Sequence, residues 1–161
     1  MRNDAIPKVF DAIAAGEWPQ AKALFESDPS LLEAKDGDGF TPLMFAVENG
    51  CMTVARLLVD LGANVNACDG YGDSPLYFAV RSGNKGMVQL LVQRGADVNA
   101  VNVAGWTPLH EAADDDSRAM AELLLALGAD SHIRDKEGRT PLDCARANGH
   151  LSVMHLLEKR G

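Results

Sequence analysis

The sequence predicts an all-α solenoid, a stack of short helix–turn–helix units in which each unit contacts mainly its neighbours. The main observation is a fixed period. The pattern Thr/Ser-Pro-Leu recurs with a step of 33 residues, beginning at Thr41, Ser74, Thr107 and Thr140. A period of about 20–50 residues is typical of stacked-repeat architectures. Two further observations agree: apolar residues follow each pattern at helical spacing, and glycines end most of the predicted helices.

The unit from Asp69 to Asn102 illustrates the local signals. Ser74 offers a hydroxyl as the N-cap of a first helix, and Pro75 occupies the first helical position, where its missing N–H costs nothing. Apolar residues at i, i+3 and i+4 give this helix one buried face, and Gly83 ends it. A second helix with the same spacing ends at Gly95. Helices this short need neighbours to bury their apolar faces.

The rest of the chain follows this order, most loosely at its beginning. Val9 to Gly16 predicts a first helix and Ala21 to Glu26 a second, with Leu24 and Phe25 facing inward, and 28–34 approximates a closing loop. Because a solenoid must shield its ends from water, an atypical first unit is expected. We predict one domain, 1–161, divided into an N-terminal capping repeat 1–35, internal repeats 36–68, 69–101 and 102–134, and a C-terminal capping repeat 135–161.

One heptapeptide resembles a known family. Residues 107–113, Thr-Pro-Leu-His-Glu-Ala-Ala, match the ankyrin-repeat motif Thr-Pro-Leu-His-x-Ala-Ala, and 62–67 and 95–100 resemble the loop that closes each repeat of that family. The resemblance is clear over 36–161. It implies two antiparallel helices and an outward β-hairpin loop in each repeat. It also implies that His110 makes a structural hydrogen bond to the backbone of a neighbouring hairpin.

Two positions depart from the repeated pattern. At the position of His110 the other units have Met44, Tyr77 and Asp143. We therefore expect the network of hydrogen bonds that His residues at this position would form along the chain to be incomplete. Where glycine ends the first helix in other units, the fourth has Asp116, which we expect in the left-handed region that Asp tolerates better than most residues. The run 114–116 of three aspartates is either an acidic contact patch for Lys or Arg of a partner or a solvated turn.

The resemblance implies protein binding through the hairpin tips and the surface of the first helices. Tyr and Trp are favoured anchors at interfaces, and rings at hairpin tips are not needed to stack helices. The alternative is that some rings pack between neighbouring hairpins. The candidate partner-contact residues are Asp38, Phe40, Phe45, Tyr71, Asp73, Phe78, Arg81, Trp106, Glu111, Asp114 and Asp115.

Composition narrows the classes of partner. The net charge of −8 disfavours nucleic acid and anionic membranes and favours a protein partner with a basic patch. No apolar run approaches the roughly 18 residues that span a bilayer, and no apolar signal region follows Met1–Asp4, so we expect a cytoplasmic monomer without membrane insertion. Cys51, Cys68 and Cys144 fit free thiols, and no spacing typical of metal ligands occurs, so neither metal nor cofactor is expected.

The sequence therefore favours a non-catalytic protein-interaction module, possible roles being an inhibitor or an adaptor. An enzyme would need a nucleophile with a base, a carboxylate pair in a pocket or a phosphate-binding loop, and the sequence presents none of these patterns. A structural scaffold and a bacterial effector or immunity protein of the ankyrin class stay open as alternatives.

Overall fold

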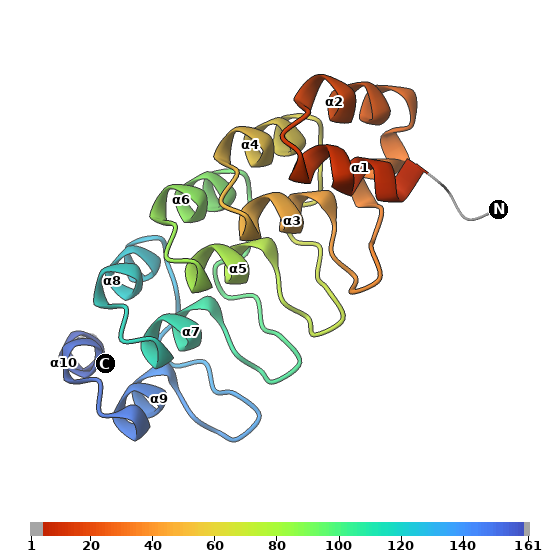
Figure 1. Cartoon of the computed structure of the whole chain (residues 1–161). Coiled ribbons are helices and arrows are strands. Elements are labelled where there is room, and N and C mark those ends of the chain that lie inside the picture. Colours follow the sequence, from red (N-terminus) through yellow and green to blue (C-terminus); the bar gives the residue numbers. More distant parts are fainter. Residues whose placement is uncertain (1–4, 160–161) are drawn as a thin grey trace.

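The computed structural model describes residues 5–159, so that Met1–Asp4 and Arg160–Gly161 lie outside it. The described chain is all-helical, and its helices alternate in order with turns and loops (Figure 1). The elements are α1 (Ala5–Ala14), α2 (Trp18–Ser27), the short 3-10 helix η1 (Pro29–Glu33), α3 (Pro42–Glu48), α4 (Met52–Asp60), α5 (Pro75–Arg81), α6 (Lys85–Gln93), α7 (Pro108–Asp114), α8 (Arg118–Ala126), α9 (Pro141–Asn148) and α10 (Leu151–Glu158).

The helices form two rows that run the length of the molecule. The odd-numbered helices α1 to α9 make an inner row, and the even-numbered helices α2 to α10 make an outer row (Figure 1). Each inner helix contacts the next inner helix and the outer helix that follows it in the chain. The long loops that precede α3, α5, α7 and α9 extend away from the outer row, side by side, and are called the hairpins below. The predicted solenoid is confirmed.

The inner helices begin where the repeated Thr/Ser-Pro-Leu pattern places them. The hydroxyls of Thr41, Ser74, Thr107 and Thr140 each accept a hydrogen bond from the backbone N–H three residues later, and a proline follows each. These caps satisfy donors that the first helical turn leaves free. The helices are short, so packing between them, more than propensity, keeps them folded.

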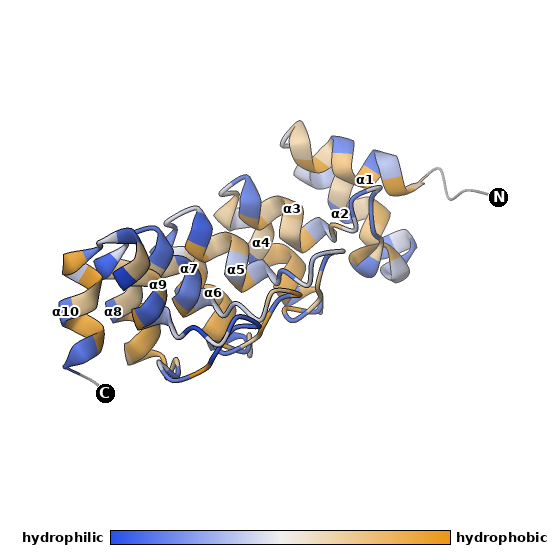
Figure 2. Cartoon of the chain, turned by 90° about the horizontal axis from the view of Figure 1, so that it is seen from below, coloured by the Kyte–Doolittle hydropathy of each residue, from blue (hydrophilic) through white to orange (hydrophobic). Residues whose placement is uncertain are grey.

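The core lies between the two rows and repeats with the chain. Leu43, Leu76 and Leu109 are fully buried at equivalent positions of α3, α5 and α7, and Leu58 and Leu91 match them in the outer row. The helices of both rows carry hydrophobic segments beside hydrophilic ones (Figure 2). Phe25 is buried and Leu24 half-buried, so the first unit joins the same core, as predicted.

The position of Asp116 confirms the expectation from the pattern of glycines. Its φ is 50°, close to 68° at Gly50, 69° at Gly83 and 72° at Gly149, and among residues 5–159 it is the one non-glycine residue with positive φ. A side chain with a Cβ is strained in this region, and Asp bears it better than most residues. The chain thus keeps the geometry of the helix end at a conformational cost.

Two local expectations need correction. The hairpins, implied as β-hairpins, contain no strand within the described chain, and each is closed by a backbone hydrogen bond such as that from Asp69 N–H to Asp73 O, 3.2 Å. Residues 28–34, expected to approximate the closing loop of a repeat, are largely helical. Asp28 caps η1 by accepting the N–H of Ser30, and the segment folds as a 3-10 helix whose Leu31 and Leu32 are buried.

Candidate binding surface

A side-chain oxygen at one repeated position shapes each hairpin. Asp36, Asp69, Asn102 and Asp135, one step of 33 residues apart, each accept the backbone N–H groups two and four residues further on. At Asp69 these donors are Tyr71, 2.8 Å, and Asp73, 2.9 Å. Such side-chain to backbone bonds stabilise tight turns. The hairpins are therefore held in one conformation without strand pairing.

Neighbouring hairpins also bond to one another through their backbones. Val103 donates its N–H to the carbonyl of Tyr71, 2.9 Å, and Lys136 donates to the carbonyl of Ala104, 3.0 Å. Gly105 permits this approach, because a Cβ there would lie 2.9 Å from the Lys136 nitrogen, and its φ of 82° is also unfavourable for other residues. The tips of the last three hairpins are therefore joined to one another and are not independent loops.

Side chains reinforce the same row. Asn102 donates from Nδ2 to Asp73, 2.9 Å, and Trp106 donates from Nε1 to Asp135, 3.2 Å. Burial raises the pKa of Asp73, and the hydrogen bond from Asn102 acts in the opposite direction. Both Asp73 and Trp106, predicted as partner contacts, thus have structural bonds inside the chain. The indole of Trp106 bonds to the neighbouring hairpin. For this residue, packing between hairpins therefore describes the ring better than a tip position that is not needed for stacking.

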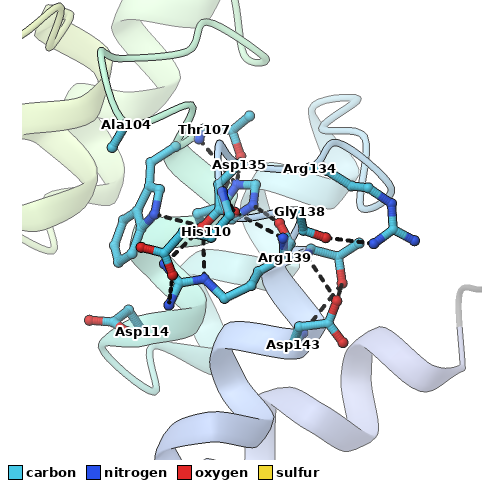
Figure 3. Close-up of polar contacts among 12 residues, drawn as sticks. Ala104, Thr107, His110, Asp114, Arg134, Asp135, Gly138, Arg139 and Asp143 are labelled. Atoms are coloured by element: carbon cyan, nitrogen blue, oxygen red, sulfur yellow. Dashed lines mark hydrogen bonds and ion pairs between the residues drawn. The ribbon is translucent and has the colours of Figure 1, made fainter.

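Asp135 is the most connected residue of the row. Its carboxylate accepts the N–H and the guanidinium Nε of Arg139, at 2.8 and 2.9 Å, and the indole N–H of Trp106 (Figure 3). Burial alone would raise the pKa of this carboxyl, but the hydrogen bonds from Arg139 and Glu137 outweigh it and lower the pKa below the ordinary 3.8. A buried carboxylate with this many donors is stable in its charged form.

The bond that the family resemblance implied for His110 is present. Nδ1 of His110 lies 3.1 Å from the backbone nitrogen of Thr107, which can only donate, so Nδ1 is the acceptor. Nε2 therefore carries the proton and donates to the carbonyl of Arg139, 3.0 Å away (Figure 3). Burial lowers the pKa of His110, which favours this neutral form. The residue links α7 to the next hairpin and has a structural role.

The other residues at the position of His110 behave differently. Sδ of Met44 accepts the N–H of Thr41 at 3.4 Å, and Asp143 accepts that of Thr140 at 3.0 Å, so the local half of the network is present in both units. Tyr77 instead donates its hydroxyl to Glu111. The network therefore varies along the chain as expected, although its local half is more complete than expected.

The ends of the inner helices form a second line of polar residues, here called the helix-end strip and made of Glu48, Arg81, Asp114, Asp115 and Asp116. Arg81 pairs with Glu48, 3.1 Å, and lies over the ring of Phe78, 4.8 Å from its centroid. Asp114 accepts a hydrogen bond from Asn148, 2.6 Å. Asp115 and Asp116 are exposed at the end of α7. The strip therefore changes from an ion pair to a group of carboxylates along the row.

The predicted contact residues fall into three groups by exposure. Asp38, Tyr71, Arg81 and Asp115 are exposed, Phe40, Phe45, Asp73, Trp106 and Asp114 are half-buried, and Phe78 and Glu111 are buried. Phe40 packs on Phe78 with ring centroids 4.9 Å apart, and Phe45 packs on Phe10 at 5.6 Å. The buried and ring-packed residues support the fold, and the exposed ones are accessible to a partner.

Sequence reasoning missed part of the exposed apolar surface. Tyr71, Val101 and Val103 are 71%, 53% and 55% exposed and lie in two adjacent hairpins. We call these three residues the tip patch. Val101 and Val103 alternate with the inward-bonded Asn102, and this apolar–polar–apolar pattern in a turn-rich segment was the available signal.

Within residues 5–159 no helix has both the length and the apolar character needed to cross a bilayer. Over the same range no three His, Cys, Asp or Glu side chains are grouped so that they could hold a metal ion.

The stacked helix pairs and the row of hairpins define a repeat protein of the solenoid class. Residues 10–102 match the family model Ankyrin repeats (3 copies), and residues 91–145 match Ankyrin repeats (many copies). The chain therefore belongs to the ankyrin repeat family. Ankyrin repeats are in general protein–protein interaction modules.

Three relatives are similar over a short stretch. The chain is similar over 60 residues to the Ankyrin repeat and SAM domain-containing protein 6 of Rattus norvegicus, Mus musculus and Danio rerio, with identities of 35%, 38% and 42%. The stretch covers 37% of this chain and 7%, 7% and 8% of the three relatives. The similarity thus concerns the repeats and a small part of each relative.

Proposed function

We propose that this protein is a non-catalytic interaction module that binds another protein through the hairpin row and the helix-end strip. The observation that carries the proposal is the tip patch: Tyr71 is exposed at a hairpin tip, and its carbonyl bonds directly to the hairpin that bears Val103. Solvent-exposed rings with a polar group are favoured anchors at interfaces. The backbone beneath this ring is fixed before a partner arrives.

Rigidity of the row supports a binding role. Each hairpin has an internal side-chain bond at Asp36, Asp69, Asn102 or Asp135, and adjacent hairpins are joined by bonds such as those of Trp106 to Asp135 and His110 to Arg139. A surface that is already ordered loses little conformational entropy on binding. The entropic cost of binding a partner is therefore lower than it would be for flexible loops.

Charge supports a partner with a basic patch. The net charge is −8, and Asp114, Asp115 and Asp116 gather at one end of the helix-end strip. Such a surface attracts Lys and Arg of a protein and repels the phosphates of nucleic acid. Asp115 and Asp116 are exposed, so the acidic contact patch is the reading we adopt for this run, in preference to a solvated turn.

Within this function we favour an inhibitor or an adaptor that acts as a monomer in the cytoplasm, with the units 1–35 and 135–161 as caps. A rigid row that covers part of a partner would block that part or bring it to a second protein. An effector or immunity protein would use the same surface, whereas a structural scaffold would hold no tight partner there. The binding experiment below separates a binding module from a scaffold without a tight partner.

Affinity capture from the source lysate tests the proposal. The baits are the wild type, a Tyr71→Ser/Asp115→Asn variant of the binding surface, and a Gln89→Ser variant of an exposed residue on the outer helix α6. We expect proteins captured by the wild type and Gln89→Ser baits to be lost with the surface variant. Capture that is equal for all three baits, or absent for all, would contradict the proposal.

A further inference from the structure

We propose that the tip patch binds an extended protein segment in which a bulky apolar side chain adjoins Lys or Arg. The inference rests on the proposed protein-binding function and specifies the chemistry of the partner. Exposed apolar surface is concentrated in this part of the hairpin row. The exposed large hydrophobic residues of the described chain are Tyr71, Val101, Val103 and Leu151, and Leu151 stands apart on α10. A single exposed apolar residue is ordinary, but three in adjoining hairpins make a contact site.

The main chain holds the two hairpins that carry Tyr71, Val101 and Val103 against each other. The bond from Val103 N–H to the Tyr71 carbonyl, 2.9 Å, joins the two hairpins at the patch. Between the valines, Asn102 bonds into its own turn and to Asp73. Gly72 lies where a Cβ would come 3.0 Å from the Val103 nitrogen, so the two hairpins approach closely. The main chain under these exposed apolar residues is therefore held in place, and we call this part of the hairpin row the platform.

Carboxylates flank the platform on its N-terminal side. Asp69 and Asp73 belong to the hairpin of Tyr71, and Asp36 and Asp38 to the hairpin before it. The nearby cation of these two hairpins, Lys35, donates to the carbonyl of Cys68, 2.7 Å. A positive charge next to the bound apolar group would therefore meet net negative charge.

The C-terminal side of the row has the opposite character. The hairpin after Val103 carries Arg134, Lys136 and Arg139 beside Asp135 and Glu137. A segment lying along the row thus meets carboxylates before the platform and net positive charge after it. This polarity orients the segment, with its Lys or Arg over the hairpins of Asp38 and Asp69.

A second copy of this chain is the less favourable occupant. Each copy carries a net charge of −8, and bringing two such molecules together costs repulsion that a basic segment would not meet. Self-association therefore serves as one outcome of the test.

The probe is a displayed library of random linear peptides selected on the intact protein. The baits are the wild type, Tyr71→Ser/Val103→Ser in the tip patch, and Leu151→Ser, which removes an equally exposed apolar residue elsewhere. We expect the wild type and Leu151→Ser to enrich peptides in which an aromatic or large aliphatic residue adjoins Lys or Arg. Such peptides, synthesised and labelled, should bind the tip-patch variant about tenfold or more weakly by fluorescence anisotropy. Asp38→Asn should weaken them less and reduce their salt dependence.

Several results would overturn the inference. They are enrichment of peptides without basic residues, equal binding to the tip-patch variant, failure to enrich any peptide, and a wild-type dimer that Tyr71→Ser dissociates in sedimentation analysis. Peptides that lose affinity with Asp115→Asn but not with the tip-patch variant would refute this inference and leave the proposed protein-binding function standing.

Discussion

Tyr77 on α5 donates its hydroxyl hydrogen bond to the buried carboxylate of Glu111 on α7. Tyr77 stands at the position that His110 occupies one unit later, where the side chain bonds instead to the next hairpin at Arg139. The same position thus joins neighbouring units in two ways, helix to helix at Tyr77 and helix to hairpin at His110. Different residues at this position therefore form different bonds between neighbouring units, and the fold stays the same.

The burial of Glu111 makes stability depend on pH. Burial raises the pKa of Glu111 above the ordinary 4.5, and Asp115 and Asp114 act in the same direction, against the hydrogen bond from Tyr77 and the charge of Arg81. The folded state thus holds this proton more tightly than the unfolded state. The contribution to stability is complete below pH 4.5 and is lost as the pH rises through the folded-state pKa.

We therefore expect the wild type to lose stability relative to Glu111→Gln as the pH rises from 4.5, by about 1.4 kcal/mol for each unit by which the pKa is raised. Urea unfolding of both proteins across this range measures the difference between their free energies of unfolding. The titration of His110 and of other groups that both proteins share cancels in this difference. A difference that stays constant or grows in favour of the wild type would show that Glu111 is not desolvated in this way.

Trp106 and Tyr71 are expected to differ in their effect on stability although both lie in the hairpin row. Trp106 is half-buried, stacks on His110 with centroids 6.2 Å apart and bonds to Asp135, so Trp106→Ala should cost about 2 kcal/mol. Tyr71 is exposed, and Tyr71→Ala should change stability by less than about 0.5 kcal/mol. Chemical denaturation measures both, and equal losses would contradict the distinction between a structural and an accessible ring.

Asp116→Gly is expected to stabilise the protein by about 1 kcal/mol, because it relieves the left-handed backbone and removes a carboxylate from the end of a helix. Asp116→Asn is the matched control, since it removes the charge and keeps a residue that tolerates positive φ. Guanidinium unfolding should rank Gly above Asn and Asn above Asp. A loss of stability with glycine would mean that the side chain makes a contact worth more than its strain.

Two glycines with nearly equal φ separate backbone strain from close approach. Gly105 has φ 82° and Gly138 has φ 79°, but an added Cβ would meet the Lys136 nitrogen at 2.9 Å only at Gly105. We expect Gly138→Ala to cost about 1 kcal/mol and Gly105→Ala about 1–3 kcal/mol more. Amide exchange at Lys136, whose N–H bonds to Ala104, should rise in Gly105→Ala alone. Equal costs would mean that the hairpins separate freely.

The sequence allowed the fold and some local conformations to be predicted because their causes are local and periodic. The caps at Thr41 and Ser74 and the left-handed Asp116 follow from a repeated pattern or its break, and the bond of His110 was implied by the family resemblance of residues 107–113. A residue in a repeated position meets the same backbone in every unit. For such residues the sequence predicts both the backbone conformation and the hydrogen-bond partner within the chain.

The bonds between units were harder to predict. Trp106 with Asp135 and Tyr77 with Glu111 are pairs 29 and 34 residues apart, and each depends on side-chain rotamers and on the spacing of two units. The sequence therefore indicated Trp106 and Glu111 as contact residues without revealing their internal bonds. Tyr71 had no such pairing, and its exposure agrees with its predicted place at a hairpin tip.

The central claim is that a partner protein meets the hairpin row and not the outer helices. Photo-cross-linking tests it most directly, with benzoylphenylalanine placed at Tyr71 in one protein and at Gln89 of α6 in another, each irradiated in the source lysate. We expect a discrete protein adduct at position 71, identified by mass spectrometry, and none at position 89. An adduct at position 89 with none at position 71 would contradict the account.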